Sequence, residues 1–213
     1  MLSASLSYDI TDWLNVSGRV RVDNSNTKYE QKLYASSNTT LTEGSTQGFY
    51  AIAKPDESQV YADILANINK RFGDYSLVVN VGASIVDNKY DELSYRGPIR
   101  ANGIPNVFNV FDLDNTQKKA RQDEWEEQTQ SIFASAELGW KSMLYLTLTG
   151  RNDWASQLAN SSSTCFFYPS VGLSAIISEM VKLPSAIDYL KIRGSFSSVG
   201  MPYPRNLTSP TFE

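Results

Sequence analysis

Apolar and polar residues alternate with a period of two along most of the chain. In residues 2–10, for example, Leu2, Ala4 and Leu6 alternate with serines. Because successive side chains of a β-strand point to opposite faces, this pattern predicts strands with one apolar and one polar face. The predicted strands span residues 2–10, 13–29, 58–72, 75–90, 127–140, 143–154, 166–178 and 189–200.

The connections between these predicted strands alternate between short and long. Tight turns are predicted at 11–12, 72–74 and 141–142, with a longer one at 179–188. Between them lie long polar loops, predicted at 30–58, 90–126 and 155–165. Short turns on one side and long loops on the other are typical of outer-membrane β-barrels, whose tilted strands need about ten residues to cross the bilayer. Aromatic residues also gather near the predicted strand ends, as in the interfacial girdles of such barrels.

The direction of the predicted strands indicates that the chain is a fragment. If the tight turns are periplasmic, the first and last strands place both chain ends on the extracellular side. A complete bacterial barrel normally begins and ends in the periplasm, and no signal peptide precedes the first strand. We therefore expect an all-β protein: a sector of about eight antiparallel transmembrane strands, residues 1–213, cut from a larger barrel.

Composition is compatible with this interpretation and excludes several others. Mean hydropathy is −0.32, as expected where apolar and polar faces alternate. A net charge of −4 without a basic run argues against nucleic acid as a partner. Histidine is absent and Cys165 is the only cysteine, which removes the commonest general base, cysteine-based zinc sites and intramolecular disulfides. We expect no enzyme activity, no cofactor and no metal site.

Several blocks of sequence resemble one known family. They are Tyr145–Ser156, Phe166-Phe167-Tyr168-Pro169, Ile176–Glu179 with Leu183-Pro184, and Leu190–Gly200. In this order and spacing they resemble the SusC/RagA branch of TonB-linked outer-membrane transporters of Bacteroidetes. The opening Ser7–Leu14 is similar to a strand pair of that family.

The resemblance implies a fold, a function and partners. It implies a barrel of 22 strands filled by an N-terminal plug, in the Gram-negative outer membrane. It also implies uptake of oligosaccharides, glycans or peptides, with a SusD-like surface lipoprotein as a lid and TonB acting through the plug. Compared with that family, we expect residues 1–213 to contain no plug domain, no TonB box and no terminal strand ending in an aromatic residue, since Phe212 is penultimate.

The candidate ligand-binding residues lie on the predicted strand 143–154. Arg151 and Asp153 could bind ligand hydroxyls while Trp154 stacks on a sugar ring, and Tyr145 shares the lumen-facing row with Arg151. The alternative, which we favour, is a girdle tryptophan beside charges that close the strand–loop junction. The acidic run 123–127 is expected to be solvated, because glycoside hydrolysis needs paired carboxyls across a cleft. Loop 97–105 contains two prolines and two glycines, which favour turns, and it could cover the barrel mouth or contact the lid.

Two other classes of protein remain open from sequence alone. A soluble carbohydrate-binding β-sandwich would use its four tryptophans as stacking platforms. It requires residues 144–148 and 190–196 to pack their apolar side chains against a facing sheet. A plug-less diffusion porin would share the strand pattern and differ in what the parent gene encodes upstream.

Overall fold

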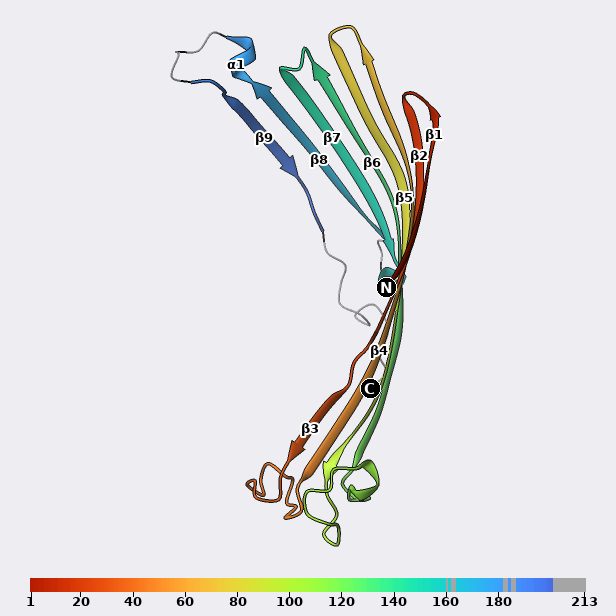
Figure 1. The fold of residues 1–213 in the computed structure, drawn as a ribbon, viewed down its shortest axis with the longest axis vertical. Helices are drawn as coiled ribbons and strands as arrows, with labels where there is room; N and C mark the ends of the chain where they lie inside the picture. The colour runs from red at the N-terminus through yellow and green to blue at the C-terminus, as the bar shows by residue number, and fades with distance from the viewer. Residues whose placement is uncertain (160, 162–163, 182–183, 185–186, 201–213) are drawn as a thin grey trace. The chain divides into compact units, whose positions relative to one another are not determined.

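The structure is a computed structural model that describes residues 1–159, 161, 164–181, 184 and 187–200. The described chain is a single nine-stranded sheet with very little helix (Figure 1). The strands are β1 (Leu2–Thr11), β2 (Leu14–Asn26), β3 (Tyr29–Leu33), β4 (Phe49–Phe72), β5 (Tyr75–Pro98), β6 (Lys119–Trp140), β7 (Leu144–Ala155), β8 (Cys165–Ile176) and β9 (Lys191–Ser197).

The strands follow one another in the sheet in nearly the order of the sequence. The path is β1-β2-β4-β5-β6-β7-β8-β9, and β3 pairs with β4 beside this path. The sheet is open, with β1 and β9 at its edges. One helical turn, α1 (Ile177–Met180), and two 3-10 turns (Val110–Asp112 and Ser156–Leu158) complete the described elements. Among the described residues, no helix combines the length and apolar character needed to cross a bilayer.

The sequence prediction of an antiparallel all-β sheet is confirmed, but several predicted strand ends are wrong. β4 begins at Phe49 instead of 58, β5 continues to Pro98 instead of 90, and β6 begins at Lys119 instead of 127. The connections are therefore shorter than the predicted loops and span residues 34–48 and 99–118.

The N-terminal and C-terminal strands also differ from the prediction. The predicted strand 13–29 ends at Asn26, and the separate short strand β3 follows it. At the other end, β9 covers 191–197 within the predicted 189–200. Leu183 and residues 201–213, with the penultimate Phe212, lie outside the described residues.

The missed segments of β5 and β6 carry polar or charged side chains on both faces, whereas the missed start of β4 has the adjacent Phe49 and Tyr50, which are both buried. In the missed part of β6, Asp123 forms an ion pair with Arg121 on one face, and Glu126 forms an ion pair with Lys89 on the other. Alternation of apolar and polar residues arises only where one face avoids water. Both faces of the β5 and β6 segments are polar and both faces at the start of β4 are covered, so the pattern that revealed the other strands is absent.

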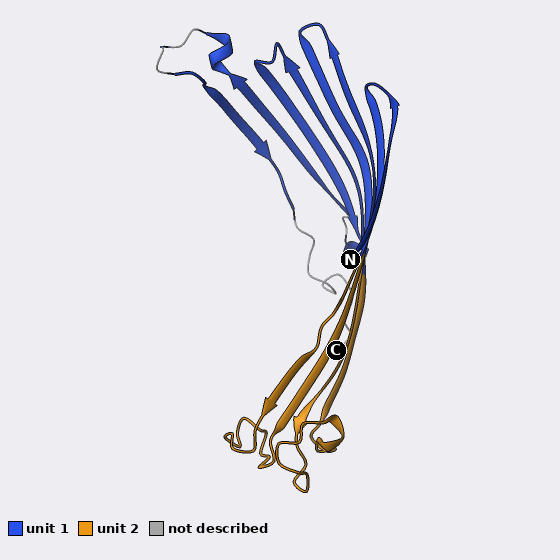
Figure 2. Cartoon of the chain, in the orientation of Figure 1, with its two compact units in different colours: residues 1–22, 60–87, 127–213 blue, residues 23–59, 88–126 orange. Residues whose placement is uncertain are grey.

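The chain forms two compact units (Figure 2). Unit 1 comprises residues 1–22, 60–87 and 127–213, and unit 2 comprises residues 23–59 and 88–126. Strands β2, β4, β5 and β6 contribute residues to both units.

The strand registers of unit 1 separate an apolar face from a polar face. Leu148 of β7 lies between Ala136 of β6 and Val171 of β8. The next residue, Thr149, lies between Ser135 and Ser170. The alternation predicted from sequence is therefore confirmed across β6, β7 and β8.

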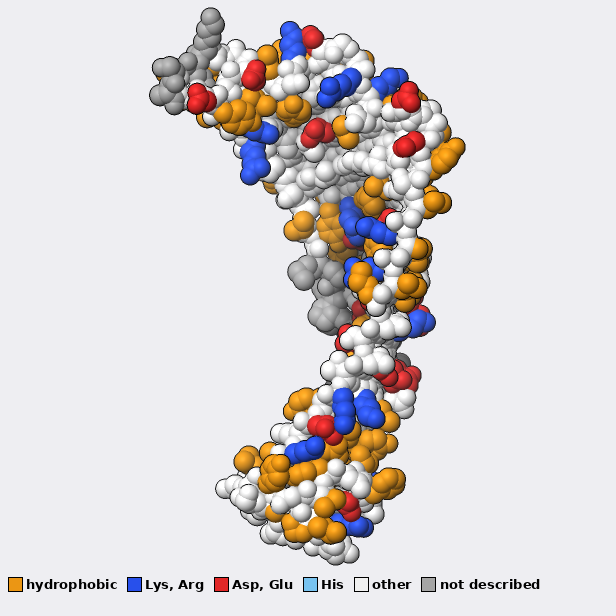
Figure 3. Space-filling model, in the orientation of Figure 1, with side chains coloured by type: hydrophobic (Ala, Val, Ile, Leu, Met, Phe, Trp, Pro, Cys, Tyr) orange, Lys and Arg blue, Asp and Glu red, His pale blue; other side chains and the backbone are white. Residues whose placement is uncertain are grey.

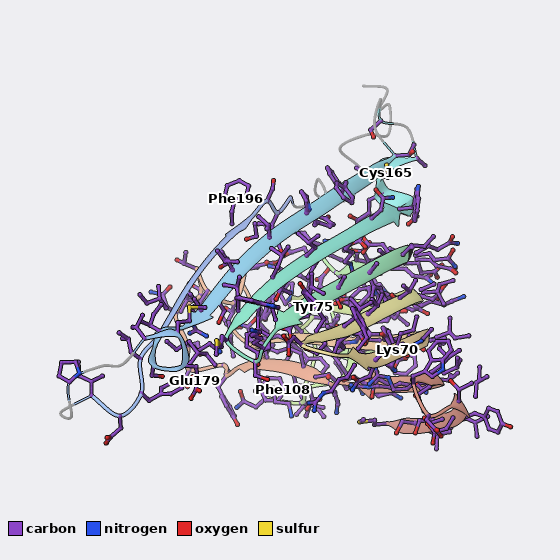
Figure 4. All side chains as sticks on the ribbon, turned by 90° about the horizontal axis from the view of Figure 1, so that it is seen from above. Lys70, Tyr75, Phe108, Cys165, Glu179 and Phe196 are labelled. Carbon is purple, nitrogen blue, oxygen red and sulfur yellow. The ribbon has the colours of Figure 1, made fainter. Side chains whose placement is uncertain are left out.

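The apolar face of unit 1 is uncovered. Leu148 is 49% exposed, and side chains on β8 and β9 are similarly open. Figure 4 shows side chains projecting from both sides of the strands, with Phe196, which is 70% exposed, on β9. Since the described residues form one sheet, the packing that the β-sandwich alternative requires is wrong.

Two glycines on the polar face of unit 1 each lie under an aromatic ring. A Cβ added to Gly82 of β5 would approach the Phe133 ring of β6 to 2.6 Å and the Ile64 carbonyl oxygen of β4 to 2.8 Å. Gly139 pairs with Tyr145, whose ring covers it in the same way. An aromatic ring over a glycine restores packing where no side chain is present and holds the strand register.

The β6–β7 turn contains a strained pair of residues. Lys141 and Ser142 have φ angles of 51° and 57°, and the Met143 amide donates to the Trp140 carbonyl at 2.9 Å. Positive φ at both central residues is the geometry of a type I′ turn, which favours asparagine and glycine. Lys141 also contacts the Trp140 ring and Asp74. Ser142 is therefore the position where a substitution can relieve the backbone strain without removing these contacts.

Replacing Ser142 with glycine is expected to stabilise the β6–β7 hairpin by about 0.5–1 kcal/mol, because glycine adopts positive φ without steric cost. The measurement is the urea unfolding midpoint of the full chain in detergent micelles. Ser142→Ala is the matched control, since alanine keeps the strain. Equal midpoints for the two variants would show that strain in this turn does not limit stability.

Unit 2 has a small core at the junction of its two loops. The loop pair, residues 34–48 and 99–118, packs around Ile99 and Leu113, each 1% exposed. The Ile99 amide donates to the Gly48 carbonyl at 2.9 Å, and the Ala35 amide donates to the Asn106 side chain at 2.7 Å. Buried backbone groups thus find partners across the loop pair, and the loops form an ordered structure.

Candidate functional site

The polar face of unit 1 is a surface of paired side chains. Arg19 and Asp63 form an ion pair at 2.6 Å between β2 and β4. Asn80 donates to the Ser135 hydroxyl at 3.0 Å, and the Thr147 hydroxyl donates to Glu137 at 3.3 Å. Such cross-strand pairs stabilise a sheet while leaving a hydrophilic surface.

Arg151 contacts three neighbouring side chains on this face. Its Nε donates to Asp153 Oδ1 at 2.6 Å, and its Nη2 donates to the Ser131 hydroxyl at 2.9 Å. The guanidinium carbon also lies 5.9 Å from the centre of the Phe133 ring. Since a guanidinium has five N–H donors, Arg151 retains donors beyond these two bonds, and its side chain is 45% exposed.

Strand β8 adds two aromatic rings that sequence reasoning did not include. Tyr168 is the register partner of Arg151, and Phe166 is the partner of Asp153. Their ring centres are 6.4 Å apart. In sequence, Phe166 and Tyr168 are two residues apart, as are Arg151 and Asp153, so each pair shares a face of its own strand. Only the β7–β8 register shows that the two pairs lie side by side. We call Ser131, Phe133, Arg151, Asp153, Phe166 and Tyr168 the Arg151 cluster.

Trp154 does not belong to the Arg151 cluster. It is the register partner of Gln130 and Cys165, on the same face as Leu148. Trp154 is 40% exposed and lines an apolar groove of about 930 Å³ with Leu6, Ile64 and other residues. The hypothesis that Trp154 stacks on a ligand held by Arg151 and Asp153 is therefore wrong, because strand alternation places them on opposite faces.

Tyr145 shares the polar face with Arg151 but lies at the other end of β7. Six residues separate them, which is about 20 Å along a strand. The Tyr145 ring covers Gly139, and Lys191 Nζ lies 6.0 Å from the ring centre. The structure therefore does not bring Tyr145 into one site with Arg151 and Asp153.

The acidic run 123–127 forms part of β6 and is divided between its two faces. Trp125 stacks on Tyr90, whereas Glu126 forms an ion pair with Lys89. The described residues contain no group of three or more side chains placed to hold a metal ion. Alternating carboxylates of one strand therefore do not converge on one point.

The 97–105 segment lies in the loop pair of unit 2. Ile99 bridges to Leu113, and the Gly103 amide donates to the Arg100 carbonyl at 2.9 Å. Arg100 and Asp112 form an ion pair at 2.8 Å. The segment predicted to form turns is thus a loop held by hydrogen bonds and an ion pair.

A buried tyrosine beside this loop pair shifts the pKa of a neighbouring carboxylate. The Tyr50 hydroxyl donates to Glu30 Oε1 at 2.7 Å, and the Tyr50 side chain is 4% exposed. The Tyr50 bond, with Lys28 and Lys32 nearby, lowers the pKa of Glu30 to about 2. Burial and the Glu30 carboxylate raise the pKa of Tyr50 to about 12.

These pKa shifts define the pH response expected of unit 2. Because the folded pKa of Glu30 is below its ordinary value of 4.5, its ionised form stabilises the fold fully above that value and stops doing so as pH falls through about 2. The Tyr50 ring signals in NMR spectra should keep their native shifts down to pH 3. Glu30→Gln should remove the transition near pH 2, and an unchanged transition in that variant would contradict this origin.

Comparison with known proteins finds relatives among solved structures only. No protein-family model and no curated protein sequence matches the chain. The RagAB peptide transporter matches with a TM-score of 0.72 and 14% identity, over 92% of this chain and 22% of that chain. The RagAB peptide importer in its "open-open" state matches with the same score and coverage and 16% identity. The siderophore receptor PiuA from Acinetobacter baumannii matches with a TM-score of 0.50 and 14% identity, over 92% of this chain and 28% of that chain.

These likenesses are all below 25% identity and define the fold. The chain has the fold of a sector of a TonB-dependent transporter barrel, as the sequence resemblance predicted. More particularly, it is similar to the barrel of the RagAB transporter, and it spans about a fifth of that chain.

Proposed function

We propose that the chain is part of an outer-membrane, TonB-dependent importer of the SusC/RagA type. The observation that carries the proposal is the division of unit 1 into an uncovered apolar face and a self-paired polar face. An apolar face of this extent needs a hydrocarbon environment. The polar face then lines the interior of the barrel. The similarity to a peptide transporter and to a siderophore receptor supports an import function.

The substrates that we propose are oligosaccharides, other glycans or peptides. The Arg151 cluster offers guanidinium donors, a carboxylate acceptor and two aromatic rings on the polar face. These are the groups with which proteins bind sugar hydroxyls or peptide amides. We propose that Arg151 and Asp153 contact passing substrate, without Trp154 and at a distance from Tyr145.

The proposed partners are a SusD-like surface lipoprotein and TonB. The loop pair of unit 2 exposes apolar side chains, among them Leu41 at 62%, Ile104 at 69% and Phe111 at 90%. Hydrophobic side chains gather there in the space-filling view (Figure 3). Exposed apolar groups on an ordered loop are typical of a protein interface, and we assign this one to the lipoprotein. TonB would act through a plug domain elsewhere in the whole transporter.

A genetic experiment in the source bacterium tests the import function. Deleting the region that encodes residues 127–176 in frame should remove most of β6 and all of β7 and β8, and abolish uptake of fluorescently labelled oligosaccharides and peptides. The double variant Arg151→Ala, Asp153→Ala should leave the protein in the outer membrane and slow uptake of one substrate class. Normal uptake of both classes in the deletion strain would exclude the proposed function.

A further inference from the structure

Unit 2 carries an aromatic platform made of Tyr90 from β5 and Trp125 from β6. The two rings stack with their centres 5.3 Å apart and their planes within 11° of parallel. Both side chains are half-buried, so part of each ring meets solvent. A pair of large rings held parallel on a sheet is a rigid surface on which a flat ligand group can stack.

Carboxylates surround this platform. Gln59 donates to Asn88 at 2.8 Å, which aligns β4 with β5 and puts Glu57 opposite Tyr90. The Tyr90 hydroxyl donates to Glu92 Oε2 at 2.7 Å. Asp123 precedes Trp125 by two residues on β6 and therefore shares its face. All three carboxylates are close enough to act electrostatically on Tyr90.

Nearby positive charges do not neutralise the three carboxylates around the platform. Arg121 forms an ion pair with Asp123 at 2.7 Å, and Glu57 and Glu92 remain beyond that pair. Lys89 forms its ion pair with Glu126 at 3.1 Å. Because Lys89 and Glu126 each adjoin a platform residue in sequence, they lie on the opposite face of the strands. The platform therefore combines aromatic rings with an excess of negative charge.

The arrangement of these groups selects an organic cation over a metal ion. A metal needs ligands that converge on one point, and the described residues contain no such group. A guanidinium is planar and weakly hydrated, stacks on aromatic rings and donates to carboxylates from its edge. We propose that the Tyr90–Trp125 platform binds a ligand through a guanidinium group, as in an arginine side chain of a peptide.

Binding of two matched peptides to the full chain in detergent micelles tests this proposal. The probes are acetyl-Gly-Arg-Gly-amide and its citrulline counterpart, which has the same shape without the charge. The readout is the NMR shift of the Trp125 indole N–H during titration. The arginine peptide should bind at least tenfold more tightly than the citrulline peptide. No binding, or equal binding of both peptides, would overturn the proposal.

Variants of the chain separate the platform from general electrostatic attraction. Trp125→Leu should weaken binding of the arginine peptide about tenfold, measured by calorimetry, and Trp125→Phe should restore part of the loss. The pair Glu57→Gln, Asp123→Asn should weaken it about fivefold.

The matched control is Glu124→Gln, Glu126→Gln, which removes the same charge from the other face of the strands. It should change binding less than twofold. If it weakens binding as much as the Glu57 and Asp123 pair does, or if Trp125→Phe and Trp125→Leu both bind normally, the site is not the platform.

Discussion

Replacing Gly82 with valine is expected to destabilise unit 1 by about 3 kcal/mol, at the upper end of the usual cost of overpacking. A Cβ at this position would lie 2.6 Å from the Phe133 ring and 2.8 Å from the Ile64 carbonyl oxygen. The ring could rotate away, but the carbonyl belongs to the neighbouring strand and cannot move without disturbing the sheet. The measurement is the urea unfolding midpoint of the full chain in micelles, followed by far-ultraviolet circular dichroism.

Gly194→Val is the control for this prediction. A Cβ at Gly194 would meet nothing within 4 Å, so the same substitution on edge strand β9 should shift stability by less than about 0.5 kcal/mol. Combining Gly82→Val with Phe133→Ala should recover part of the loss, because one of the two contacts is then removed. Equal midpoints for Gly82→Val and Gly194→Val would contradict the close packing of ring and glycine.

Replacing Leu148 with arginine is expected to cost about 2–4 kcal/mol, the range measured for arginine on the lipid side of outer-membrane barrels near the bilayer centre. Leu148 lies mid-strand on the apolar face, between Ala136 and Val171. Neither of these neighbours can pair with a cation. The measurement is assembly of the full chain into phospholipid vesicles, scored by protection from added protease, together with the unfolding midpoint.

Thr147→Arg, one residue away, is the control for Leu148→Arg. Thr147 lies on the polar face and donates to Glu137, so an arginine there gains a carboxylate partner. It should assemble normally and change stability by less than about 1 kcal/mol. If Leu148→Arg assembles as well as Thr147→Arg, the apolar face does not contact lipid and the proposed membrane orientation is wrong.

Sequence alone was sufficient for the parts of the fold that face two different environments. Leu148 and Thr149 differ in polarity because their faces differ, and this difference predicted both the strand and its orientation. Asp123 and Glu126 in the missed part of β6 lie on opposite faces and are both charged, whereas the adjacent Phe49 and Tyr50 at the start of β4 are both buried. The extensions of β4, β5 and β6 in unit 2 therefore had no signal to detect.

The candidate site was partly predictable from the same alternation. Arg151 and Asp153 are two residues apart and share a face, as expected. Trp154 is an odd number of residues from Arg151, so the alternation by itself places it on the apolar face. The addition of Tyr168, Phe166 and Phe133 required the β6–β7–β8 register, which the alternation within one strand does not define.

The continuous register of β6, β7 and β8 also restricts how this chain can change in length. Inserting one residue into β7 would turn every following side chain of that strand to the other face, moving Arg151 toward lipid and Leu148 toward the polar side. Insertions of two residues, or of any number in the connections 34–48 and 99–118, keep the faces intact. Related chains should therefore vary in length freely in these connections, and their strands should differ only by even numbers of residues.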